Sequence, residues 1–244
     1  MSSRELAMEA LGHATTSYNF LHRYLDDSSY TKPSTYRTQS PMEILQRMAS
    51  DERFDGIVDH EGSTDLEKLF TEHEDLLLEY WNAWQISSPK RHFEDSQYAA
   101  TALLAATQKS GSSSYDFFLV HLLTTSHAVR ILLPVVPAKF HIALVRQWWL
   151  LSLAVYVIQL RPSIDLKSVL GYDIAGRDWK WINQQAIGSR WATDAHYVKA
   201  LRAMEVAAST WGDQSTFYIR AAVKFGEGFQ GWGGFGPLGE EGMQ

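Results

Sequence analysis

The sequence predicts an all-α fold, a single-domain helical bundle built around a central pair of buried helices. Apolar residues recur at spacings of three and four along most of the chain, which is the period of one helix face. Two segments, 115–133 and 140–160, are too long for strands and too apolar for surface helices, so they predict the central pair. No alternating run in the sequence indicates a strand.

The first third of the chain predicts two helices separated by a loop. Residues 3–25 carry apolar residues at helical spacing, whereas residues 26–40 are rich in Ser, Thr and Tyr and are typical of a loop. Ser40 then begins a helix over 41–50 as its N-cap, with Glu43 at the position of a capping box.

The same spacing predicts the other helices, and turn-forming residues separate them. Besides the central pair, helices are expected at 66–84, 93–108, 179–188, 193–211 and 214–229. Gly212 follows one of them directly, as a residue that ends a helix commonly does. The domain is expected to span residues 1–244, with four flexible segments of which the last is a Gly-rich C-terminal tail: about 26–40, 51–65, 110–114 and 231–244.

Composition excludes several classes of protein. About 45% of the 244 residues are apolar, which is enough for a sizeable core. The absence of cysteine excludes disulfides, thiolate zinc sites and cysteine nucleophiles, and it fits a cytoplasmic protein. The formal net charge is -6 with Lys and Arg dispersed, so no basic stripe indicates a nucleic-acid partner.

The segment 142–160 has the composition closest to that of a membrane span. It carries Arg146 near its start, and a charge inside a bilayer is costly. We therefore expect a buried core helix and no membrane association.

Four of the nine histidines lie where a buried ligand could be placed. His13 is near the apolar face of the first helix, and His196 lies in a late helix. His121 and His127 share the first central helix, but six residues separate them by about 120° around it. Both cannot point at one site, so one is expected to bind a ligand and the other to have a structural role.

Lys199 follows His196 by three residues and therefore lies on the same helix face. A lysine there is ordinarily an exposed cation. If it were buried beside a metal, its pKa would fall, and the neutral amine could take up carbon dioxide to form an anionic carbamate. Spacing alone does not predict that step, and no compact metal motif such as H-E-x-x-H occurs.

Two patterns carry no chemistry in this interpretation. The run 231–236 fits G-x-G-x-x-G, but it follows a helix and precedes a tail, whereas a dinucleotide site needs a strand before it and a helix after it. The carboxylates of 72–79 are typical of a solvated helix face.

Six separated blocks in order along the chain carry a resemblance. They are 9–13, 78–84, 115–127, 146–149, 176–179 together with 191–196, and 231–236. These blocks resemble the questin oxidase-like family of fungal polyketide-tailoring enzymes in secondary metabolism. The resemblance implies an oxidoreductase that opens a ring of anthraquinone-type polyketides in a Baeyer–Villiger-like oxygenation and requires NADPH.

The resemblance also implies a non-haem iron site built from histidines and, in some members, a carboxylated lysine. Carried over by position, the candidate metal ligands are His13, His121, His196 and Lys199, with His127 as the alternate. Four tryptophans could line an aromatic substrate pocket, although core packing explains each of them as well: Trp81, Trp84, Trp148 and Trp149. The catalytic residues and any NADPH-binding residues are left open.

One difference from the family matters for function. Members are longer and carry a histidine-rich segment upstream, so the chain resembles their C-terminal half. The chain is therefore interpreted as a truncated homologue, as one subunit of a split enzyme in which a second chain supplies the missing half, or as an incomplete gene product. The alternative is a catalytically inactive helical scaffold, or one subunit of a split enzyme.

Overall fold

The computed structural model describes residues 3–62, 66–108 and 112–236. The chain divides into two compact units, Met1–Pro33 and Ser34–Gln244. Each unit is described by itself, and the prediction of a single domain over 1–244 stays a prediction.

The N-terminal unit replaces the predicted helix 3–25 by shorter pieces. Helix α1 ends at Thr16, because Asn19 is extended and its side chain accepts the N–H of Leu21 to start a new turn. All 13 residues of α1 are exposed. The pieces are α1 (Arg4–Thr16), the 3₁₀ turn η1 (Phe20–His22), α2 (Arg23–Asp26) and η2 (Ser28–Tyr30), the last inside the predicted loop.

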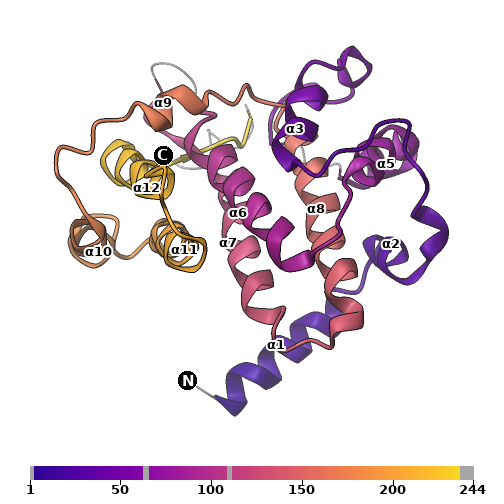
Figure 1. The fold of residues 1–244 in the computed structure, drawn as a ribbon, viewed down its shortest axis with the longest axis horizontal. Coiled ribbons are helices and arrows are strands. Elements are labelled where there is room, and N and C mark those ends of the chain that lie inside the picture. Colours follow the sequence, from indigo (N-terminus) through magenta and orange to yellow (C-terminus); the bar gives the residue numbers. More distant parts are fainter. Residues whose placement is uncertain (1–2, 63–65, 109–111, 237–244) are drawn as a thin grey trace. The chain divides into compact units, whose positions relative to one another are not determined.

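Among the described residues of the larger unit, the regular structure is helical apart from one pair of two-residue strands and one isolated bridge between Thr38 and Trp84, so the all-α fold is confirmed (Figure 1). Its α-helices are α3 (Pro41–Ala49), α4 (Leu66–Glu72), α5 (Glu74–Ala83), α6 (Pro89–Ala105), α7 (Phe117–Leu132), α8 (His141–Ile158), α9 (Leu166–Leu170), α10 (Trp179–Gly188), α11 (Ala195–Trp211) and α12 (Phe217–Gly228). The 3₁₀ turns are η3 (Glu52–Phe54) and η4 (Ala138–Phe140), and the strands are β1 (Tyr115–Asp116) and β2 (Trp232–Gly233).

Helices α7 and α8 form the central buried pair that the sequence predicts, and α6 joins them (Figure 1). In Figure 1, α10, α11 and α12 lie on one side of these three helices and α3 and α5 on the other. The C-terminal half of α6 is rich in fully buried alanines, and α6 packs against α7. Helix α7 contacts α6, α8 and α11, and its first two turns carry the candidate site.

The boundaries of several helices differ from prediction for local reasons. Helix α6 begins at Pro89, since proline suits the first turn, and not at 93. The helix predicted over 66–84 is interrupted at His73, whose φ of -130° is not helical. Gly212 ends α11 with a φ of +86°, as expected. Ser40 caps α3 as predicted, since its hydroxyl accepts the N–H of Glu43. The carboxylate of Glu43, which in a capping box would accept the N–H of Ser40, accepts the hydroxyl of Thr38.

Besides 26–40, which contains η2, two other segments predicted to be flexible contain regular structure. Residues 51–62 include η3, whose Phe54 is buried. The segment 231–236 includes β2, which pairs in parallel with β1, so a short strand is present here that no run in the sequence indicates. The flexibility of 231–244 stays a prediction. Residues 63–65, 109–111 and 237–244 lie outside the described residues.

Within the described residues, one helix is long and apolar enough to span a membrane, the segment Ala138–Ile158 that contains α8. More than half of its most apolar window is buried inside the protein, as in the core helix of a soluble protein. The guanidinium of Arg146 lies 3.8 Å from the centre of the Trp81 ring and donates to Asn82. Packing within the unit thus accounts for the apolar character of α8.

Candidate metal-binding site at the start of helices α7 and α11

The structure brings together two of the predicted ligands, His121 of α7 and His196 of α11. Their ring centres lie 4.8 Å apart, although the two residues are far apart in the sequence. Both side chains are half-buried. The packing of α7 against α11 therefore creates a pair of imidazoles at one place on the bundle.

The ring of His121 is oriented by its own helix. Its Nδ1 lies 2.6 Å from the carbonyl oxygen of Phe117, one turn earlier, so Nδ1 carries the proton and donates it to that oxygen. The lone pair is then on Nε2. Metal-ligating histidines are commonly fixed in this way, with the second nitrogen bonded to a backbone carbonyl.

His196 is held toward its neutral form. Burial lowers the pKa of this imidazole most, the nearby His121 and Lys199 lower it further, and Asp194 opposes them. A neutral imidazole has a free lone pair, which is the form that binds a metal.

Aromatic rings enclose the pair. Phe117 packs edge-on against both imidazoles, with ring centres 4.7 Å from His121 and 4.8 Å from His196. Trp232 lies 6.2 Å from His196, and Phe235 lies 5.2 Å from Phe117. The segment that sequence analysis assigned to a flexible tail therefore forms part of the site. Tryptophan and phenylalanine alternating with glycines in 231–236 is the signal that could have identified this role.

The other predicted ligands are not part of this imidazole pair. Lys199 is exposed, so it lacks the buried surroundings that carbamate formation would need, and its role as a ligand stays a prediction. His127 lies near Arg130 and Arg202, which together with burial lower its pKa, and its Nδ1 is buried without a partner among the described residues. His13 belongs to the N-terminal unit, so its role as a ligand stays a prediction.

The four tryptophans proposed for a substrate pocket are buried in the core around α5 and α8. Trp84 and Trp149 pack edge to face at 5.3 Å, and Trp148 donates to the carbonyl of Leu122. Trp81 lies under Arg146 and donates to its carbonyl oxygen. These contacts are those of core packing, and a role in binding substrate stays a prediction.

The donor set fits part of an iron site. The pair offers two imidazole nitrogens, a ligand type that suits iron. Within the described residues, no group of three His, Cys, Asp or Glu side chains could hold a metal. A complete site would need further donors, and His13 and Lys199 remain the candidates for them.

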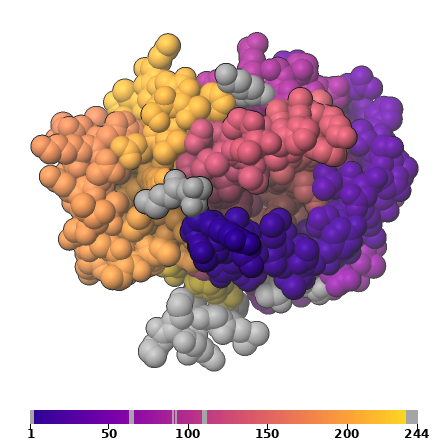
Figure 2. Space-filling model, turned by 90° about the horizontal axis from the view of Figure 1, so that it is seen from below, coloured from indigo at the N-terminus to yellow at the C-terminus, as the bar shows by residue number. Residues whose placement is uncertain are grey.

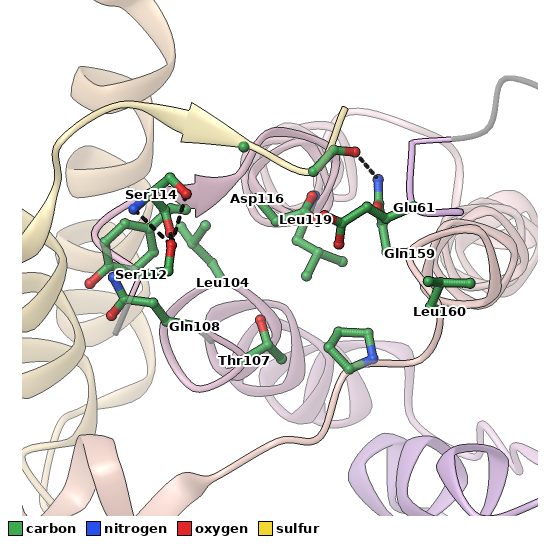
Figure 3. Close-up of a pocket in the computed structure, with 14 residues that line it drawn as sticks. Glu61, Leu104, Thr107, Gln108, Ser112, Ser114, Asp116, Leu119, Gln159 and Leu160 are labelled. Atoms are coloured by element: carbon green, nitrogen blue, oxygen red, sulfur yellow. Dashed lines mark hydrogen bonds between the residues drawn. The ribbon is translucent and has the colours of Figure 1, made fainter. Parts of the chain in front are cut away.

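A separate pocket of about 180 Å³ lies beside the same strand pair and is lined by neither histidine (Figure 3). Its lining combines the carboxylates of Glu61 and Asp116 with the buried amide of Gln159. Gln159 accepts the N–H of Gly62 at 3.2 Å. It also donates to the carbonyl of Gly234 at 3.3 Å (Figure 3). Sequence analysis assigned no role to this pocket; a glutamine at the end of an apolar core helix was its visible signal.

Taken together, the fold and the site define a helical bundle that presents paired histidines from two of its helices. The chain belongs to the questin oxidase-like family, whose model matches residues 1–204. It is therefore a protein of oxidoreductase type, connected with polyketide chemistry. No curated protein matches the chain. The segment 231–236 lies beyond the matched residues.

Proposed function

We propose that this protein is an oxidoreductase that opens a ring of an anthraquinone-type polyketide by oxygenation, at a non-haem iron held in part by His121 and His196. The observation that carries the proposal is the imidazole pair, 4.8 Å apart, with the Nε2 of His121 left free by the bond of its Nδ1 to Phe117. Membership of the questin oxidase-like family supports an oxidoreductase. Ring-opening oxygenation is proposed from the resemblance described under Sequence analysis.

The overall reaction balances with dioxygen and NADPH as co-substrates. One oxygen atom enters between a carbonyl carbon and its neighbouring ring carbon, and the other leaves as water. NADPH and one proton supply the two electrons and the hydrogens for that water. Hydrolysis of the resulting ester then opens the ring. Iron, when bound, would activate dioxygen or polarise the quinone carbonyl.

The chain's own residues would orient the reactants. His121 and His196 would hold the metal from one side, and His13 and Lys199 are the candidates for the remaining protein ligands. The rings of Phe117, Trp232 and Phe235 present an aromatic surface beside the pair, on which a flat polyketide can stack. A second chain would complete the pocket if this chain acts as part of a split enzyme.

Iron content tests the proposal directly. Protein purified from iron-supplemented cells should contain stoichiometric iron by elemental analysis. The His121→Ala/His196→Ala variant should bind Fe²⁺ more weakly by at least about tenfold, since it loses two ligands. His127→Ala is the matched control, because His127 lies on the same helix and is also half-buried, and it should keep its iron. His13→Ala in the same assay tests the third ligand.

The alternative function is a scaffold or a partner-binding subunit. Apolar residues exposed around the connection between α7 and α8 favour it, as such surfaces often mark interaction sites (Figure 2, rose). They are Ile131, Leu132, Val135, Phe140 and Ile142. Sub-stoichiometric iron that the double variant leaves unchanged would reject the iron proposal and leave this alternative.

A further inference from the structure

The segment 231–236 connects the starting points of the two helices that carry the histidine pair. On one side, β2 pairs in parallel with β1, which leads directly into α7, and the N–H of Tyr115 donates to the carbonyl of Gly231 at 3.1 Å. On the other side, the indole N–H of Trp232 donates to Oδ2 of Asp194 at 2.7 Å. The same six residues therefore contact both helix starts.

Asp194 is also the N-cap of α11. Its Oδ1 accepts the backbone N–H groups of His196 at 2.8 Å and Tyr197 at 2.9 Å. Helix ends fray where their first N–H groups lack partners, and His196 is the second residue of α11. One carboxylate thus holds the turn that carries His196 and, through its other oxygen, the indole of Trp232.

The attachment on the α7 side depends on glycine. A Cβ on Gly234 would lie 2.5 Å from Oδ2 of Asp116, the residue whose Oδ1 caps α7. Outside α7, a Cβ on Gly236 would collide with the carbonyl oxygen of Glu61. Both glycines also have positive φ, of +87° and +68°. The backbone of this segment is therefore seated against the start of α7 at a distance that side chains would prevent.

We infer that the hydrogen bond from Trp232 to Asp194 is a positioning link that sets the separation of the His121 and His196 imidazoles. The contacts connect the two histidines without a break. His196 is held by its cap Asp194, and Asp194 is hydrogen-bonded to β2. β2 pairs with β1, which continues into the helix of His121. Without the link, packing along α7 and α11 still holds the helices together, but the first turn of α11 loses its outside support. The part of the inference that concerns iron binding rests on the proposed function. The part that concerns the spacing of the two imidazoles is independent of it.

Two variants break the link from opposite sides. Trp232→Phe keeps an aromatic ring and removes only the N–H, and Asp194→Asn keeps a capping oxygen while replacing the acceptor of the indole by an amide. Trp191→Phe is the matched control, because Trp191 is also half-buried and packs on Phe229, and its indole N–H has no partner within the described residues. Circular dichroism confirms that all three are folded.

The first measurement uses metal-free protein with labelled histidines. Nuclear Overhauser contacts between the ring protons of His121 and His196 should be present in the wild type and in Trp191→Phe, and lost in both link variants. Unchanged contacts in Trp232→Phe overturn the inference. Loss in Asp194→Asn alone assigns the effect to the helix cap and overturns it as well.

The second measurement is titration with Co²⁺ as a spectroscopic probe of the same donors. The link variants should bind Co²⁺ about tenfold more weakly than the wild type, as is common when support behind a ligand is removed. Equal affinity in the wild type and Trp232→Phe contradicts the link. A wild type that binds no Co²⁺ contradicts the iron proposal, and the ring contacts in metal-free protein then decide the link by themselves.

Discussion

At the scale of residues, the histidines of α7 have different surroundings although they are only six positions apart. His121 faces His196 and an aromatic wall, whereas His127 lies near the cations Arg130 and Arg202. The helical period predicts this separation in direction, since six residues turn the side chain by about 120°. Burial and these nearby cations make protonation of His127 unfavourable, and its role as the alternate metal ligand stays a prediction.

His127 should therefore make the protein less stable in acid. Burial, and then Arg130 and Arg202, lower the pKa of this imidazole below its usual 6.5. The unfolded chain then binds more protons than the native protein, so this contribution to the free energy of unfolding is complete above about pH 6.5 and is lost as the pH falls through the lower native pKa. Urea unfolding between pH 7 and 5 should show a shallower loss in His127→Gln than in the wild type.

His196 contributes with the same sign, so a residual slope is expected in that variant. An identical slope in the wild type and His127→Gln would show that His127 is not held neutral by its neighbours.

Sequence analysis identified both members of the imidazole pair but not the residues that surround them. His121 and His196 were recognisable from their place in apolar helices and from the family resemblance. Trp232 and Asp194 were missed, because their hydrogen bond joins segments whose distance in space depends on the whole fold. The glycines of 231–236 are predicted as flexibility, whereas in the structure they permit close approach of the backbone. The prediction that this run is no dinucleotide site stays a prediction.

At the scale of elements, a buried polar contact joins three helices of the core. Gln97 of α6 is fully buried, and its Oε1 accepts the indole N–H of Trp211 of α11 at 2.7 Å. Its Nε2 lies 3.4 Å from the hydroxyl of Ser126 in α7. The helical period predicted these helices, but it could not predict which polar residue of one helix would meet which residue of another.

Replacing Gln97 alone should lower the free energy of unfolding more than replacing it together with its partner Trp211. Gln97→Met leaves the Trp211 N–H without its acceptor and should lower the free energy of unfolding by about 1–3 kcal/mol. In the double variant Gln97→Met/Trp211→Phe the orphaned donor is absent, so the double loss should be smaller than the sum of the single losses. Urea unfolding measures all four proteins.

The surface change Gln85→Met serves as the control, since Gln85 is exposed, and should change stability by less than about 0.5 kcal/mol. If the loss of unfolding free energy in the double variant equals the sum of the two single losses, Gln97 and Trp211 are not coupled.

At the scale of the whole molecule, stability is concentrated around α7 and α8. Their core residues are almost completely buried, whereas every residue of α1 is exposed. Sequence analysis predicted the central pair because long apolar segments have few other uses in a soluble protein. It overestimated the length of the first helix, because apolar spacing continues past Ser17 and Asn19 even though local hydrogen bonds end the helix there.

Hydrogen exchange should separate these regions. Amides of α7 and α8 are expected to be among the slowest to exchange, because they open only with the core. Amides of α1 should exchange fastest among the helices, since 13 residues without buried side chains form a marginal helix. Mass spectrometry after a series of labelling times checks this order. If the amides of α1 exchanged as slowly as those of α8, burial within each unit would not determine the order of exchange.

The pairing of β1 with β2 also has a consequence for synthesis. During synthesis β1, which precedes α7, leaves the ribosome much earlier than its partner β2, which follows α12. Helices can form as they emerge, but the aromatic enclosure of the two imidazoles has to wait until Trp232 has left the exit tunnel. A chain that stops after α12 would keep most of its helices while lacking this enclosure, so a helical circular dichroism spectrum alone would not distinguish a finished molecule from an interrupted one.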